Sequence, residues 1–404
     1  MKKLTAASIV LASLFIGCST GSIKTKVEIR SIEIDLDRTE EVIRLSEVVE
    51  GIEYIFLEKG NFIGSLDKIY SHGDKYYLLD KKGQKVHVYD RYGRFIGQLF
   101  AQGPGPEEYS SIDFAEINRQ DGTIDIFDIV GKKIVSYDDE GAFVRSIKAP
   151  LISRDFTTTD DGGYLFYCPD EQNLAFGKEL QTGVYYLSKD GRKLNLVNPI
   201  GGLNFSPILT PYSFVRNGPN VDLFSCYSDT IFTFDNNSVS SRLLMMYSEP
   251  TNFRLLEDPR FTQKLASDNT ALLKIYPFSS NGFLSYVFSK NGKSYILVKK
   301  ESEVSIVEKV INDLDGGHPL ILNSFPKGDD SLVAFIAENN ILTIDEMTGD
   351  NLKYLDKNNI ILDSAKLDRR QKAIDHVLGP DRNGDGHPVL IVAKLKAPVS
   401  LDRN

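Results

Sequence analysis

The chain has 404 residues, of which 41% are apolar and 25% charged, and this composition excludes a disordered or collagen-like protein. The net charge of −9 argues against nucleic acid as a partner. The length exceeds what one ordinary compact core accommodates. A closed repeat architecture escapes that limit, because each unit buries only its two faces against its neighbours.

The first segment has the pattern of a targeting signal. Lys2 and Lys3 precede an apolar stretch over residues 4–16, which is too short for a membrane-spanning helix. The stretch ends in Gly17-Cys18, and this end resembles the bacterial lipobox. The resemblance implies cleavage before Cys18 and acylation of its thiol and its new amine, so that lipid chains anchor the protein to the membrane. The alternative is an ordinary secretory signal in which the cysteine is incidental.

These features predict a domain organisation and a location. Residues 1–17 form a lipoprotein signal peptide, and residues 18–39 form a lipidated linker with an N-terminal strand. Ser19, rather than Asp, follows the cysteine, and by resemblance to the usual sorting rule this favours the outer membrane of a Gram-negative bacterium. We expect the remaining chain to be a soluble domain in the periplasm or at the cell surface.

An internal repeat is visible in the first half of the chain. Segment 80–96 aligns without a gap with segment 128–144, matching Asp80 with Asp128 and a Tyr-Asp pair with another. Glycines also match, and glycine supplies the positive φ that tight turns require. Each copy predicts a strand that ends in Asp, a turn, a second strand, a tight turn and a third strand.

Weaker copies follow further along the chain, in residues 185–191, 231–236 and 287–298. Strands and turns at this density indicate an all-β fold. A repeat of roughly 45–58 residues with four strands per unit is typical of β-propeller blades. The sequence therefore predicts a β-propeller over residues 40–396 with six blades, or seven as the alternative, followed by a tail over 397–404.

The two chain ends each carry an alternating strand pattern, over residues 27–36 and 389–396. We expect the chain ends to share one blade, since this removes the exposed sheet edge of an open ring. Helices are expected only as short insertions, one starting at Asp258 and one capped by Ser364 that ends at Gly379.

Several stretches resemble the six-bladed β-propeller lipoprotein family of Bacteroidetes. They are residues 45–57, 88–96, 102–109, 312–317 and 387–391, and the most specific is Gly-Pro-Gly followed by Glu108-Tyr109. The resemblance implies six blades related to NHL-type propellers. It implies no activity and no catalytic residues.

Asp80 and Asp128 are candidate ligand-binding residues. They occupy equivalent strand ends, where a propeller can present a ring of carboxylates at its mouth. The simpler interpretation is that both initiate turns, because Asp bonds its own backbone two residues on.

A second candidate site is Asp313, Asp315 and His318, whose side-chain types suit a divalent cation. The simpler interpretation is a polar turn between strands. Segment 381–386 has the beginning of an EF-hand loop, but Val392 stands where that loop requires glutamate. No cofactor is otherwise predicted.

Two further motifs have structural interpretations. Cys168 and Cys226 follow apolar strands in equivalent places, so we expect buried thiols rather than a disulfide, which needs a short Cα separation. The Gly-Pro repeat over residues 103–106 is expected to form a rigid turn over Tyr109 rather than an anion-binding nest, because its prolines lack N–H donors.

No catalytic motif with a nucleophile is present in the sequence. We therefore expect a non-catalytic binding or scaffold module that presents its propeller to a ligand or an envelope protein. One alternative is a metal-assisted hydrolase or lyase with Asp and His ligands on the propeller axis. A second is a glycan-binding protein of a polysaccharide-uptake system, in which tyrosine replaces the absent tryptophan.

Overall fold

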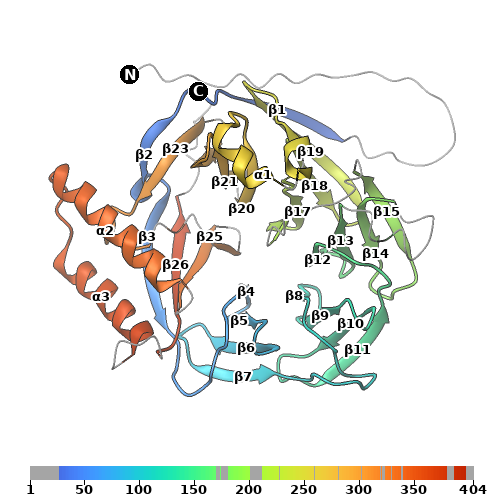
Figure 1. The fold of residues 1–404 in the computed structure, drawn as a ribbon. Coiled ribbons are helices and arrows are strands. Elements are labelled where there is room, and N and C mark those ends of the chain that lie inside the picture. The colour runs from blue at the N-terminus through green and yellow to red at the C-terminus, as the bar shows by residue number, and fades with distance from the viewer. Residues whose placement is uncertain are drawn as a thin grey trace, which may run out of the picture.

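The computed structural model describes residues 27–169, 173, 181–200, 212–226, 228–258, 260–280, 282–301, 303–318, 320, 324–328, 330–337, 340–379 and 386–396. Over these residues the strands form six sheets arranged in a ring (Figure 1). The predicted six-bladed β-propeller is therefore confirmed, and seven blades are excluded.

Each blade contains four antiparallel strands, which follow one another in order from the axis to the rim. The innermost strands are β4 (Lys68–His72), β8 (Phe114–Ile117), β12 (Asp155–Thr158), β16 (Phe214–Asn217), β20 (Leu272–Ser280) and β24 (Phe325–Lys327). The second strands are β5 (Lys75–Asp80), β9 (Ile124–Asp128), β13 (Tyr164–Cys168), β17 (Asn220–Leu223), β21 (Phe283–Lys290) and β25 (Ser331–Ile336). We number the blades 1 to 6 in the order of these strands.

The outer half of each blade completes the sheet. The third strands are β6 (Lys85–Asp90), β10 (Lys133–Tyr137), β14 (Gly183–Leu187), β18 (Thr230–Asp235), β22 (Lys293–Lys300) and β26 (Val389–Leu395). The fourth strands are β7 (Phe95–Leu99), β11 (Phe143–Lys148), β15 (Leu194–Pro199), β19 (Ser238–Tyr247), β23 (Glu303–Ile311) and, in blade 6, β3 (Val49–Phe56).

The two chain ends share blade 6, as predicted, but the first strand does not close the ring. That role belongs to β3, which pairs with β26. The predicted N-terminal strand, β1 (Glu28–Ile34), instead adds in parallel to the rim of blade 4, beside β19. β2 (Glu40–Arg44) adds in the same way to β23 of blade 5.

Apolar side chains fill every junction between neighbouring blades. Six of the hydrophobic clusters among the described residues each fill the junction of one pair of adjacent blades, and a smaller one contains Leu255 and Leu272. Phe127, Phe156 and Phe166, for example, pack together between blades 2 and 3 and are at most 1% exposed. Because every second residue of a strand faces a neighbouring sheet, these buried rings set the spacing of the blades.

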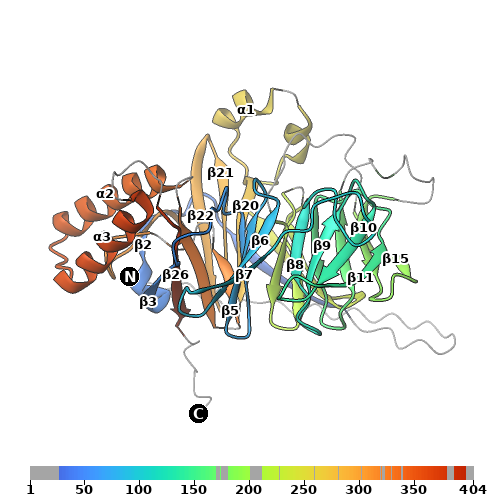
Figure 2. The same cartoon turned by 90° about the horizontal axis from the view of Figure 1, so that it is seen from below.

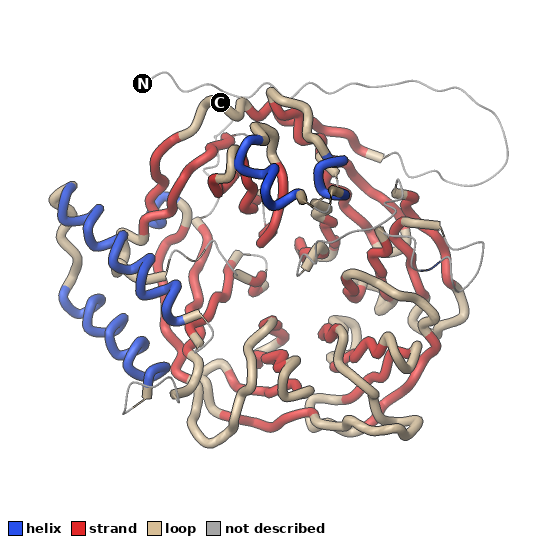
Figure 3. The backbone as a smooth tube through the Cα atoms, in the orientation of Figure 1, coloured by secondary structure: helices blue, strands red, loops and turns tan. Residues whose placement is uncertain are grey.

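The helices, blue in Figure 3, are additions to the strands of the ring. The longer ones are α2 (Ile341–Lys357) and α3 (Ser364–Leu378), inserted between β25 and β26 beside blade 6. α1 (Phe261–Lys264) lies with η3 (Phe253–Glu257) and η4 (Leu265–Ser267) on one face of the ring, which we call the α1 face (Figure 2). Another short helix, η1 (Leu45–Glu47), precedes β3.

The two predicted helical insertions are both present. In α3, however, the cap is Asp363 rather than Ser364, because the Asp363 carboxylate accepts a hydrogen bond from the N–H of Ala365 at 2.8 Å. Gly379 ends the helix with a φ of +73°, as expected. No helix in the described part of the chain is long and apolar enough to cross a membrane.

Candidate functional site

A pocket forms a channel on the propeller axis. All six innermost strands line it, and its free volume is about 80 Å³. Its wall includes one apolar side, formed by Pro277, Phe325 and Pro326, and a charged side formed by blades 1, 2 and 4. A void of this size and polarity holds several waters or a small polar ligand.

Lys68 and Glu116 form a salt bridge across the boundary between blades 1 and 2 in this channel. The Lys68 Nζ lies 2.6 Å from the Glu116 Oε1, and the two side chains are 12% and 9% exposed. The ammonium also lies 4.9 Å from the ring centre of Tyr70 and 4.8 Å from that of Tyr212. A carboxylate and two aromatic faces thus compensate the desolvation of this cation.

Asp155, at the start of β12, accepts the backbone N–H groups that begin blade 4. Its carboxylate bonds the N–H of Ser213 at 2.5 Å and that of Phe214 at 2.7 Å. Burial raises its pKa above the ordinary value, although the positive charge of Lys68 and the backbone hydrogen bonds oppose this. The carboxylate therefore fixes the junction of blades 3 and 4 at the edge of the channel.

Arg216, in β16, has a different environment from Lys68. Its Nη2 donates hydrogen bonds to the backbone oxygen and the hydroxyl of Thr158, the latter at 2.6 Å. Its Nη1 is buried and has no acceptor among the described residues. Burial, together with the positive charge of Arg119, lowers the pKa of Arg216 to about 10. This guanidinium is thus a buried cation with unused N–H donors.

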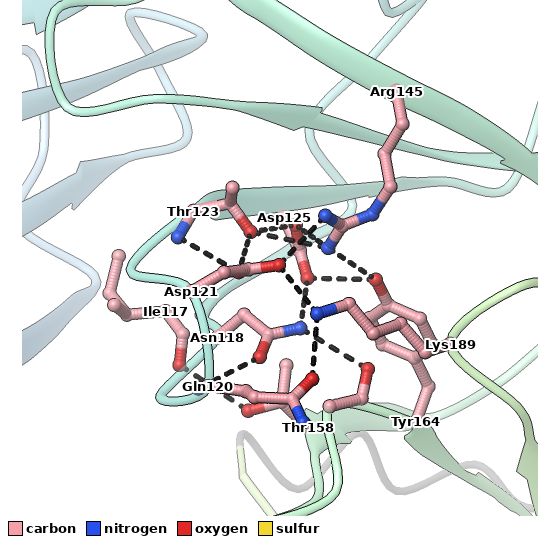
Figure 4. Close-up of polar contacts among 11 residues, drawn as sticks. Ile117, Asn118, Gln120, Asp121, Thr123, Asp125, Arg145, Thr158, Tyr164 and Lys189 are labelled. Carbon is pink, nitrogen blue, oxygen red and sulfur yellow. Dashed lines mark hydrogen bonds and ion pairs between the residues drawn. The ribbon is translucent and has the colours of Figure 1, made fainter.

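A network of polar side chains lies between blades 2 and 3 (Figure 4). Asp121 lies 2.9 Å from both the Arg145 Nη1 and the Lys189 Nζ. Burial alone would raise the pKa of Asp121, but hydrogen bonds from Lys189, Thr123 and Arg145 hold it well below its usual range.

Asp125 is the buried centre of the network. The Tyr164 hydroxyl donates to its Oδ2 at 2.9 Å, and the Asn118 amide donates to the same atom at 3.0 Å. Burial raises the pKa of Asp125, against the opposing effect of Arg145. Since these groups come from both blades, the network fastens blade 2 to blade 3.

Thr158 connects this network to the channel. Its hydroxyl donates to the Ile117 carbonyl oxygen at 3.3 Å and accepts the hydrogen bond from Arg216. The orientation of the Arg216 guanidinium is therefore fixed by a rigid polar contact rather than by solvent.

Asp80 and Asp128, the candidate ligand-binding residues, lie within turns and are both buried. Asp80 accepts hydrogen bonds from the N–H groups of Gly64, Ser65 and Gly83. Burial would raise its pKa, but hydrogen bonds from His87 and these N–H groups lower it to about 2.

Asp128 repeats this arrangement, accepting from the N–H of Ser110 and that of Gly131, both at 2.7 Å. A Cβ on Gly131 would lie 2.4 Å from the Asp128 carboxylate, which explains the repeated spacing from aspartate to glycine. The contacts seen at both aspartates are those of turn residues, and ligand binding by them stays a prediction.

Asp313, Asp315 and His318 do not converge on one point. Asp313 accepts from the N–H and hydroxyl of Ser46. Asp315 accepts from the Tyr54 hydroxyl at 2.6 Å, and the Nδ1 of His318 accepts from the Leu320 N–H at 2.8 Å. Within the described ranges, no three His, Cys, Asp or Glu side chains form a group suited to a metal ion.

The remaining sequence candidates have simpler outcomes. Cys168 and Cys226 are both buried thiols, as predicted. In the Gly-Pro turn, the Glu108 carboxylate accepts the N–H of Gly105 at 2.7 Å, so the chain's own side chain occupies that donor, and Tyr109 is fully buried. Cys18 and the EF-hand-like segment 381–385 lie outside the described residues.

The channel residues Lys68, Glu116 and Arg216 were not singled out from the sequence. One signal was present: each is a charged residue beside apolar residues in a short innermost strand. A charge in such a strand faces either solvent or a shared polar cavity, and only the closed ring shows that all three face the axis.

Comparison with solved structures agrees with the propeller fold. A Bacteroides fragilis protein that is inferred to be exported matches with a TM-score of 0.63 and 16% identity, covering 91% of this chain and 99% of its own. A member of the DUF4221 family from Bacteroides vulgatus matches with a TM-score of 0.47 and 11% identity, covering 86% and 97%. At 16% identity the likeness to the Bacteroides fragilis protein shows the fold alone.

At the level of sequence, no curated protein matches the chain. A family model described as a domain of unknown function, DUF4934, matches residues 30–393, which include all six blades. The chain therefore belongs to the DUF4934 family.

Proposed function

We propose that this protein is a cell-envelope lipoprotein whose β-propeller is a binding module, with the axial channel as its ligand site. The observation that carries the proposal is the buried Arg216 guanidinium, which leaves its Nη1 without an acceptor among the described residues, in a pocket that all six blades line. A propeller needs no such group for stability, because an unsatisfied buried donor is costly.

The arrangement favours binding over chemistry. The charged groups of the channel are engaged with one another or with backbone groups: Lys68 with Glu116, and Arg216 with Thr158. Such preorganised donors recognise a polar group at little cost in reorganisation. A hydrolase or lyase with an axial metal, and a glycan-binding protein, are the alternatives that experiment must separate from this proposal.

A pair of tryptophan variants tests the channel as the ligand site. The chain contains no tryptophan, so each variant also carries a single fluorescent reporter. Ser71 lines the channel in β4, and Ser71→Trp fills part of it. Gln98 is exposed on β7 at the rim, and Gln98→Trp is the matched control.

Ligands are identified by screening a small-molecule library for compounds that raise the melting temperature of the chain without its signal segment. We expect hits that S71W abolishes and Q98W retains, and that are recovered unchanged after incubation. Conversion of a hit to product contradicts a binding module, and a stoichiometric divalent metal in elemental analysis of the same protein favours the metal-dependent alternative.

The envelope location is tested separately. The lipobox resemblance and the fold likeness to a protein inferred to be exported support it. We expect the native chain to fractionate with outer membranes and to incorporate labelled palmitate, and Cys18→Ala to lose both properties. Equal fractionation of the two forms contradicts the lipid anchor.

A further inference from the structure

We infer that the axial channel holds a small oxyanion, a carboxylate or phosphate group, at the guanidinium of Arg216. The inference rests on the proposed binding function and makes its ligand specific. The Nη2 of Arg216 has its acceptors in Thr158, whereas the Nη1 is buried and has none among the described residues. Arginine N–H groups match the oxygens of carboxylates and phosphates.

Cations outnumber carboxylates among the charged groups that line the channel. Of the charged groups that line it, Lys68, Arg119 and Arg216 are cations, while Glu116 is the carboxylate and is engaged by Lys68 at 2.6 Å. An anion in this position receives the field of two guanidinium groups in a place that is partly shielded from water.

A second donor without an acceptor lies in the same wall. The hydroxyl of Ser324, directly before β24, is buried and has no partner among the described residues. It comes from blade 6, whereas Arg216 comes from blade 4. Two separate blades thus direct unused donors to one channel, and a ligand with two or more acceptor oxygens satisfies both.

The rest of the channel wall limits the size and polarity of the remainder of the ligand. Pro277, Phe325 and Pro326 provide apolar surface, and the free volume of about 80 Å³ limits size. A short organic acid with an apolar end satisfies both sides of the channel. Inorganic phosphate satisfies the charged side alone, so comparison of the two anions identifies the source of the oxyanion.

Calorimetric titration tests the inference with three probes at constant ionic strength: propionate, inorganic phosphate and the neutral isostere propionamide. We expect an oxyanion to bind and propionamide not to bind. Arg216→Gln should weaken oxyanion binding at least tenfold. Arg192→Gln removes the same charge from a side chain that is 85% exposed in the β14–β15 turn, and should leave the affinity unchanged.

Two results overturn the inference. One is the absence of binding by both anions up to about 10 mM, a concentration above the roughly millimolar Kd of a weak complex. The other is equal affinity in R216Q and R192Q. In either case, a neutral ligand that S71W excludes leaves the proposed binding function standing while the oxyanion assignment fails.

Folding of R216Q is controlled with a second variant. Ser324→Ala removes only one hydroxyl and leaves the guanidinium and its contact with Thr158 intact. We expect S324A to weaken oxyanion binding several-fold and to unfold at the temperature of the native chain. An unchanged affinity in S324A, together with an R216Q protein that does not fold, also overturns the site as described.

Discussion

Blades 1 and 2 are stabilised within their turns, whereas blades 5 and 6 depend on strands supplied by the N-terminal segment. In the first pair, buried carboxylates at Asp80 and Asp128 collect the N–H groups of neighbouring turns. In the second pair, β2 extends blade 5 and β3 completes blade 6. Local hydrogen bonding is therefore sufficient for a regular blade, but ring closure requires pairing between distant parts of the chain.

The largest expected effect comes from removing the strands that close the ring. A chain starting at Lys59 lacks β3 and exposes the edge of β26, whose Val389, Leu390 and Ile391 are fully buried. We expect this chain to be insoluble, because an unpaired apolar edge strand promotes aggregation. Soluble yield and circular dichroism measure the effect.

The matched control starts at Glu40 and removes only β1. Its loss exposes part of a cluster that includes Ile32 and Ile34 but leaves blade 6 complete. We expect it to fold with a melting temperature lower by several degrees. The chain starting at Lys59 lacks β2 as well as β3, so equal behaviour of the two truncations would contradict a special role for this pair of strands.

The next largest effect is expected where blade 6 meets blade 1. Gly93 has a φ of +84°. A Cβ there would lie 2.3 Å from the carbonyl oxygen of Phe56, the last residue of β3. Gly93→Ala should cost about 3 kcal/mol or more, since the strained backbone and the clash add. Urea denaturation measures this difference.

Gly73 separates the two contributions to that cost. Its φ is +57°, but nothing lies within 4 Å of an added Cβ. Gly73→Ala should therefore cost only about 1 kcal/mol, the strain of the backbone alone. A G93A protein no less stable than G73A would mean that the backbone at Phe56 moves away from the added Cβ without cost.

A smaller effect is expected from a single turn carboxylate. Asp80→Asn should lower the free energy of unfolding at pH 7 by about 2 kcal/mol, because the folded state holds the pKa of Asp80 at about 2. This stabilisation is present above the ordinary pKa of 3.8 and disappears as the pH falls through the folded value. The difference between the native chain and D80N should thus shrink between pH 4 and pH 2.

Asp128→Asn is the comparison for D80N, since Asp128 accepts from two backbone N–H groups and Asp80 from three. We expect a smaller loss of stability in D128N. Melting curves across the same pH range record both variants, and a pH-independent difference for D80N would show that its effect does not arise from the carboxylate charge.

The smallest effect is expected at the surface of the closing blade. Lys394 Nζ lies 3.0 Å from Glu50 Oε2, with the two side chains 57% and 45% exposed. Lys394→Gln should change the free energy of unfolding by less than about 0.5 kcal/mol, since solvent screens exposed ion pairs. A larger loss would assign part of the closure to ion pairing rather than to β3.

The sequence predicted the fold well where structure is local. The alignment of segment 80–96 with 128–144 depends on turn chemistry within a few residues, and the structure has the expected strands and turns there. α2 was missed because Gly349 and two threonines, Thr343 and Thr348, reduce its helix propensity. The closing strand was assigned wrongly because apolar and polar residues alternate in both β1 and β3. Such alternation does not indicate which strand is the pairing partner.

The channel could not be predicted from the sequence, for a physical reason. Lys68, Glu116 and Arg216 contribute to one site from three blades, and the distances between them are set only when the ring closes. The aspartates that stand out in the repeat are prominent because every turn of that kind needs them. Repetition therefore identifies what builds the blades, whereas residues of the site occur once.

The pairing of the first three strands also has a consequence for how the molecule forms. Glu28 pairs with Ser241, Glu40 with Val307 and Val49 with Leu395, so each early strand waits for a partner roughly 200 to 350 residues later. A nascent chain therefore cannot complete blades 4, 5 and 6 until Tyr247, Ile311 and Leu395, respectively, have been synthesised. The high contact order implies slow, late folding, and an early strand left unpaired for so long remains available to chaperones.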